Sequence, residues 1–109
     1  MNIDGTKISM IRGDDESLTV TAGYKKFMPG DMVEITVRQY AGLGTKVLHK
    51  VATEFTEDGK AEFHFSPQDT GMLAFGTYSY DCQVTFQDIG VKTIIPPSTF
   101  EIKMENTYD

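Results

Sequence analysis

Apolar and polar side chains alternate along most of this chain with the period of a β-strand, and helical spacing is nearly absent. Residues 77–86 give the clearest example, because one face of this segment carries Tyr78, Tyr80, Cys82, Val84 and Phe86. Successive side chains of a strand point to opposite faces of its sheet. The segment therefore predicts a central strand with this face in the core.

A second core strand is predicted over residues 32–39, which follow the turn sequence Pro29-Gly30-Asp31 and place Val33, Ile35 and Val37 inward. Shorter strands are indicated on either side of the polar turn 13–16 and near the end of the chain. Their inward residues are expected to be Ile8, Met10, Leu18, Val20, Phe100, Ile102 and Met104.

Residues 46–55 and 60–65 flank the turn sequence Glu57-Asp58-Gly59 and predict a hairpin. A two-residue turn would place Phe63 opposite Glu54 and bury a carboxylate. A three-residue loop with Gly59 in the left-handed conformation pairs Phe63 with Thr53 instead. Since an unpaired buried charge costs several kcal/mol, we expect the three-residue loop. The same register pairs Phe65 with Val51, turns His64 outward, and turns His49 inward near its strand end.

A helix start is indicated at Ser66, with Pro67 at the first helical position and Asp69 in the first turn. Gly71 and Gly76 limit this helix to about one turn, which we expect to cross the end of the fold. Further along, Pro96-Pro97 cannot donate hydrogen bonds to a central ladder. We therefore expect a bend there, between two short strands.

These elements predict one domain over residues 1–109: an all-β, immunoglobulin-like antiparallel β-sandwich of seven or eight strands with one short helical turn. Tyr80-Asp81-Cys82 is similar to the Tyr-x-Cys sequence of antibody domains, without their partner cysteine or core tryptophan. Residues 45–53, which carry Lys46 and Lys50, are a candidate for the exposed edge, where lysines can equally serve to prevent aggregation.

Net charge limits the classes of partner, and cysteine content indicates the compartment. The chain has 16 acidic and 10 basic side chains, a net charge of -6, so its mean field repels nucleic acid and anionic membranes. We expect neither as a partner, and we interpret Lys25-Lys26 as a solvated loop. One cysteine fits a reducing cytosol. No apolar stretch suits a cleaved signal or spans a bilayer, so secretion by such a signal and membrane insertion are disfavoured.

The side chains capable of chemistry are scattered. His49 and His64 are expected on opposite faces, which does not suit a shared metal site. Asp14-Asp15-Glu16 lacks the ligand spacing of a calcium loop and is expected to be a solvated turn. Gly42-Leu43-Gly44 lacks the third glycine of a nucleotide-binding loop and is expected to be a flexible tip.

The remaining candidate nucleophile, Cys82, falls between Tyr80 and Val84 on the buried face, with no base nearby in sequence, and is expected to be inert. We therefore predict no enzyme activity, no catalytic residue, no cofactor and no metal.

One stretch is more distinctive: Ser66-Pro67-Gln68-Asp69-Thr70, then Leu73, then Gly76-Thr77-Tyr78-Ser79-Tyr80-Asp81-Cys82-Gln83-Val84. It resembles the N-terminal immunoglobulin-like domain of tailed-bacteriophage baseplate upper proteins, which related small phage and prophage structural proteins share. The positions that carry the resemblance are Asp69, Thr70, Leu73, Gly76, Tyr78, Tyr80 and Asp81. The similarity extends to residues 13–14, 18–20, 33–38, 93–95 and 99–102.

The resemblance implies a virion structural protein of the baseplate, neck or tail, which is assembled in the bacterial cytoplasm. Its partners would be other virion proteins, with a homo-oligomer, such as a ring formed by edge-strand pairing, as a further expectation. The alternative is a stand-alone carbohydrate-binding β-sandwich, which should display a planar row of exposed aromatic rings. A small enzyme on a β scaffold is a third hypothesis, for which the sequence supplies no catalytic constellation.

Overall fold

The computed structural model describes residues 1–39 and 44–104, in which the chain forms eight strands and one short helix. The elements are β1 (Asn2–Asp4), β2 (Lys7–Ile11), β3 (Glu16–Val20), β4 (Met32–Arg38), β5 (Lys46–Ala52), β6 (Ala61–Phe65), α1 (Pro67–Gly71), β7 (Gly76–Phe86) and β8 (Gly90–Lys103). No helix among these residues is long and apolar enough to cross a membrane.

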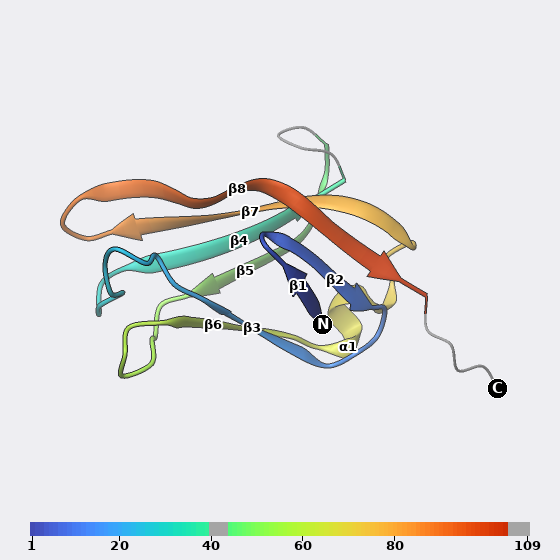
Figure 1. Ribbon diagram of the computed structural model, residues 1–109, viewed down its shortest axis with the longest axis horizontal. Coiled ribbons are helices and arrows are strands. Elements are labelled where there is room, and N and C mark those ends of the chain that lie inside the picture. The colour runs from blue at the N-terminus through green and yellow to red at the C-terminus, as the bar shows by residue number, and fades with distance from the viewer. Residues whose placement is uncertain (40–43, 105–109) are drawn as a thin grey trace.

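The strands form two sheets of very different width, packed face to face (Figure 1). The wide sheet has six strands in the order β1-β2-β8-β7-β4-β5, and the narrow sheet pairs β3 with β6. This division, with β3 and β6 facing β4, β7 and β8, matches the immunoglobulin-like plan in which strands B and E lie opposite C, F and G. The predicted all-β sandwich is confirmed.

Strand direction departs from the prediction in one place. β2 runs parallel to β8, with Ile8 beside Phe100 and Met10 beside Ile102, whereas the other strand pairs are antiparallel. The parallel pairing follows from the route of the chain, because β1 and β2 form a tight hairpin that attaches to the final strand from outside. The sandwich is therefore mixed and not wholly antiparallel.

The predicted core faces of the two long strands are confirmed. Val33, Ile35 and Val37 on β4 are each at most 1% exposed, and β7 buries Tyr80, Cys82, Val84 and Phe86, while Tyr78 is half-buried. The opposite layer adds further side chains: Leu18, Val20, Ala61, Phe63 and Phe65. The sequence predicts that Met104 extends the core at the end of the chain, but β8 stops at Lys103 and Met104 is 50% exposed.

The predicted hairpin between residues 46–55 and 60–65 is wrong. β5 pairs with β4 in the wide sheet, and β6 pairs with β3 in the narrow one, so Phe63 lies opposite Leu18 and Phe65 opposite Glu16. The tight loop itself is confirmed, since Gly59 has φ +74° and the Thr56 amide donates to the Lys60 carbonyl at 3.0 Å. The loop is a local turn that carries the chain from one sheet to the other.

Because β5 pairs with β4, its inward face differs from the one predicted. His49 points outward, opposite Thr36, and lies 2.8 Å from a carboxylate oxygen of Glu34. Lys50 lies opposite the buried Ile35, and its Nζ reaches an Asp69 carboxylate oxygen at 2.8 Å. The prediction of an exposed edge here is confirmed, because β5 is the last strand of the wide sheet.

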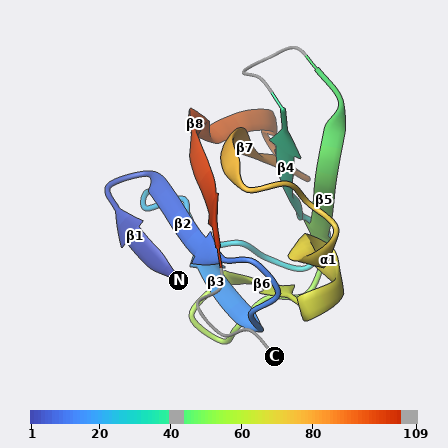
Figure 2. The same ribbon diagram turned by 90° about the vertical axis from the view of Figure 1, so that its right-hand side faces the viewer.

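The helix start is confirmed. Pro67 occupies the first turn of α1, and the Asp69 carboxylate accepts a hydrogen bond from the Ser66 amide at 2.8 Å. Figure 2 shows α1 beside β5 on one side of the sandwich and the β1–β2 hairpin on the other. The helix thus lies at the β5 edge of the wide sheet, and the β1–β2 hairpin forms the other edge of the same sheet.

Pro96 and Pro97 do not divide β8 into two strands as predicted. The strand is continuous, but its pairing with β7 shifts at the prolines: Tyr80 lies opposite Ser98 and Cys82 opposite Ile95. A second shift follows, because Gln83 lies opposite Thr93, so β8 carries two extra residues here. These irregularities accommodate two prolines that cannot donate to a ladder.

We expect Asp69→Ala to lower the free energy of unfolding by about 1–2 kcal/mol at pH 7, because it removes the cap and the Lys50 contact. Burial raises the pKa of Asp69, but hydrogen bonds from Lys50 and Ser66 outweigh it, and the pKa lies below its ordinary value. A carboxylate with a lowered pKa stabilises the fold above its unfolded pKa and loses that contribution as the pH falls through its folded pKa. Denaturation between pH 7 and pH 2 should show the difference from wild type shrinking with acidity.

Gln68→Ala is the matched control, because Gln68 is exposed on the same helix. It should leave stability within about 0.5 kcal/mol of wild type. If Asp69→Ala had the same melting temperature as the wild-type protein at pH 7, the capping role would be refuted.

Candidate interaction surface

Three connections meet at one end of the sandwich, on the left of Figure 1: residues 21–31 between β3 and β4, residues 53–60 between β5 and β6, and residues 87–89 between β7 and β8. We call this the loop end. The described surface has three neighbouring hollows here, of about 330, 550 and 220 Å³. Hollows flanked by loops on a rigid sandwich are common places for recognition.

Phe27 anchors the first connection to the core. Its side chain is 3% exposed, and its ring centroid lies 5.4 Å from that of Phe55 and 6.1 Å from that of Phe86. Its amide donates to the Gly59 carbonyl at 3.1 Å. A loop residue therefore joins two connections and the end of β7 in one packed cluster.

Asp31 joins the first connection to the third. Its side chain is buried, with one carboxylate oxygen accepting from the Met28 amide at 2.8 Å and the other from the Gln87 amide at 2.9 Å. Two amide donors satisfy a carboxylate that would otherwise be costly to bury. The sequence marks Asp31 only as a turn residue, because nothing local indicates a hydrogen bond to Gln87.

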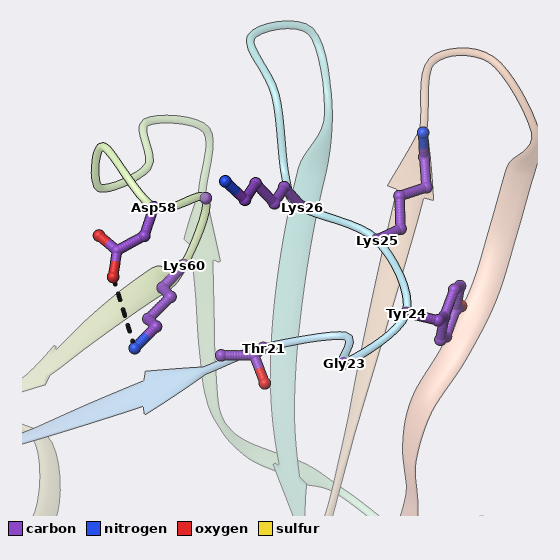
Figure 3. Close-up of a pocket in the computed structure, with 8 residues that line it drawn as sticks. Thr21, Gly23, Tyr24, Lys25, Lys26, Asp58 and Lys60 are labelled. Atoms are coloured by element: carbon purple, nitrogen blue, oxygen red, sulfur yellow. Dashed lines mark ion pairs between the residues drawn. The ribbon is translucent and has the colours of Figure 1, made fainter.

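Figure 3 shows the hollow of about 330 Å³, whose walls include Lys25, Lys26, Lys60 and Asp58. Lys60 lies 3.5 Å from Asp58, whereas Lys25 turns away and pairs with Asp88 at 3.0 Å. Asp88 has a pKa below its ordinary value because of the hydrogen bond from Lys25, partly opposed by desolvation. The sequence predicts a solvated loop at Lys25-Lys26. Lys26 is exposed, and the exposed ion pair of Lys25 with Asp88 also links two connections.

Large apolar side chains remain exposed around these polar links. Tyr24 is 66% exposed, Met28 58% and Ile89 49%, and Val91 at the start of β8 is 61% exposed. The Tyr24 ring lies 6.5 Å from that of Phe86, so its inner edge rests on the core while the rest faces solvent. Aromatic and methionine side chains in such clusters are typical of protein interfaces.

The residues of the distinctive motif lie in α1, just after it, and in the first half of β7, and they do not line the loop-end hollows. Asp69, Thr70 and Leu73 are in or just after α1. The Thr70 side chain is fully buried, and its hydroxyl accepts from the Gly13 amide at 2.9 Å, which joins the β2–β3 turn to the helix. Leu73 is half-buried and packs against the core cluster.

The β7 part of the motif also makes structural contacts. Gly76 starts the strand, the Tyr78 hydroxyl donates to the Ala74 carbonyl at 2.7 Å, and the Tyr80 hydroxyl donates to the Thr6 carbonyl. Burial, together with the neighbouring Cys82, raises the pKa of Tyr80 to about 12. Asp81 lies opposite Thr36 in the wide sheet. Both phenols thus tie β7 to neighbouring connections.

The side chains capable of chemistry stay apart. His64 pairs with Asp15 on the narrow sheet, and His49 pairs with Glu34 on the wide one. Within residues 1–39 and 44–104, no group of three His, Cys, Asp or Glu residues could hold a metal ion. Burial, with smaller effects of Asp81 and Glu34, raises the pKa of the Cys82 thiol to about 12, so the sulfur is protonated and unreactive at neutral pH.

Two further predicted loops lie between strands. Asp14 and Asp15 are exposed, as a solvated turn requires, and Glu16 pairs with the amino terminus. Of the predicted tip Gly42-Leu43-Gly44, the first two residues lie outside the described residues.

No protein-family model matches the chain, and no curated protein is significantly similar to it.

Gly59 should be essential to the loop end. It combines φ +74° with close packing, because a β-carbon there would lie 2.5 Å from the Lys26 Cβ and 3.1 Å from the Lys26 Cα. We expect Gly59→Ala to lower the free energy of unfolding by about 2–4 kcal/mol, from backbone strain plus the clash. Urea denaturation measures this loss.

Gly23→Ala separates the two causes, because Gly23 has φ +83° but no atom lies within 4 Å of the position that a β-carbon would take. Gly23→Ala should lower the free energy of unfolding by about 1–2 kcal/mol, the cost of the backbone strain alone. Equal losses in the two variants would show that the contact between Gly59 and Lys26 contributes nothing.

Proposed function

We propose that this protein is a non-enzymatic structural subunit of a bacteriophage or prophage particle, in its baseplate, neck or tail. It acts through contacts with other virion proteins and is assembled in the bacterial cytoplasm. The loop end forms the contact surface.

The exposed apolar side chains of the loop end carry this proposal. Tyr24 and Ile89 are the sequence neighbours of Lys25 and Asp88, and Met28 lines one hollow together with that ion pair. Each of the three is about half exposed or more. Burying such side chains against a partner is favourable, by about 25 cal/mol per Å² of apolar surface removed from water. The three connections are already joined by Phe27, Asp31 and Lys25, so little loop ordering would be lost on binding.

The assignment to a phage particle rests on the resemblance of the Asp69 to Asp81 motif to the baseplate upper proteins. The structural contacts of Thr70, Tyr78 and Tyr80 are consistent with a motif that maintains a scaffold. The net charge of -6 supports protein partners over nucleic acid.

Carbohydrate binding, the alternative, has less support. Among the described residues, the exposed aromatic rings are Tyr24, in the β3–β4 connection, and Phe75, directly before β7 at the strand end away from that connection. The Arg12 guanidinium covers the Phe75 ring at 4.1 Å from its centroid. These two rings cannot form one planar platform for a sugar chain.

The proposal predicts that the protein is a constituent of purified phage particles. Particles from a producing strain should contain it at a fixed ratio to the major tail protein, measured by quantitative mass spectrometry after gradient purification. Replacing Tyr24 and Met28 by serine should reduce incorporation about tenfold or more, the effect of losing roughly 1.4 kcal/mol of interface energy.

Met72→Ser is the control, because Met72 is 94% exposed at the end of α1, away from the loop end. It should be incorporated normally. Absence of the folded wild-type protein from particles would refute the virion role. Loss of incorporation in Met72→Ser, with normal incorporation of the double variant, would refute the loop end as the contact surface.

A further inference from the structure

The largest of the three hollows lies between the β3–β4 connection and residues 53–57, and has a volume of about 550 Å³. Its apolar walls come from Phe27, Met28, Pro29 and Phe55. This volume falls within the range of pockets that bind small ligands or single large side chains, and such pockets are lined mainly by apolar groups with a few polar ones. The composition of this hollow fits that description.

The floor of the hollow is fixed and its rim is adaptable. Phe27 is buried against Phe86 and packs on Phe55 at a centroid distance of 5.4 Å and an interplanar angle of 42°. Met28 is 58% exposed, and its unbranched side chain can adjust to the shape of an entering group. The hollow is therefore suited to an aromatic or long aliphatic group.

The charges at the rim favour a cation. Glu54 and Glu57 both line the hollow and are exposed, whereas Lys26 is its one basic lining residue. Figure 3 shows the Lys26 side chain extending toward the loop that carries Asp58. Two carboxylates against one ammonium group leave the rim with a negative balance, which would attract a basic group beside the apolar one.

We propose that this hollow binds an apolar or aromatic side chain of a partner protein that carries a lysine or arginine next to it in the bound segment. The inference rests on the proposed function, since it specifies the chemistry of the partner at the loop end. The apolar group supplies most of the affinity, and the cation, placed near Glu54 and Glu57, supplies selectivity.

Phenethylammonium is a suitable probe, because it joins one aromatic ring to one cation. In an NMR titration of the full chain, amide shifts should concentrate at residues 27–28 and 53–57. Phenethylammonium should bind about two- to fivefold more tightly than phenylacetate, which carries the same ring with the opposite charge, as expected for exposed ion pairs. Ethylammonium, which lacks the ring, should produce no localised shifts.

The double substitution Glu54→Gln with Glu57→Gln should abolish the preference for phenethylammonium while the ring still binds. Asp14→Asn with Glu62→Gln removes the same number of charges elsewhere, from exposed positions in the β2–β3 turn and on β6, and should retain the preference. Unchanged thermal melting in both double variants verifies that folding is intact.

Three outcomes would overturn the inference: no localised shifts with phenethylammonium, equal binding of the two aromatic probes, or tighter binding of phenylacetate. Equal binding would indicate an uncharged apolar occupant, and the reverse preference an acidic one. These outcomes differ from a failure of the proposed function, because a protein present in particles but without the probe preference would retain its virion role.

Discussion

The narrow sheet cannot cover the wide one, and much of the structure follows from this mismatch. β3 and β6 have five residues each, whereas β7 has 11 and β8 has 14. Apolar side chains on the inner face of the wide sheet must still be removed from water. Segments outside the narrow sheet complete the cover: Phe27 comes from a loop, Thr70 comes from α1, and the β1–β2 edge of the wide sheet itself lies at the side.

This requirement explains why the loop end is built like a core. Phe27 packs on Phe86, its amide bonds to Gly59, and the buried Asp31 carboxylate joins the Met28 and Gln87 amides. Because the inner side of each connection packs and forms hydrogen bonds, its backbone is held in place. A fixed backbone that carries the exposed Tyr24, Met28 and Ile89 side chains suits recognition, since a partner would have little loop motion to restrain.

The sequence predicted the features that depend on local periodicity and local turn chemistry. Alternation located β4 and β7 with their buried faces, and Ser66, Pro67 and Gly59 marked a helix start and a tight loop. The sheet partner of β5 could not be deduced in this way. Lys50 occupies an inward position, but a lysine there looks like an outward residue in the sequence. Its charge is paired with Asp69, which is distant in the chain. The roles of Phe27 and Asp31 were missed for a similar reason, since their partners Phe86 and Gln87 are remote in sequence.

The most direct test of the claim that packing holds the loop end in place is amide hydrogen exchange on the free protein. The Phe27, Met28 and Gln87 amides donate to Gly59 and Asp31. We expect these three amides to exchange at least about a hundredfold more slowly than unstructured peptide, near the rates of the β3 and β6 amides. Exchange of these three amides at the rate of unstructured peptide, with the strands still protected, would contradict a preformed surface.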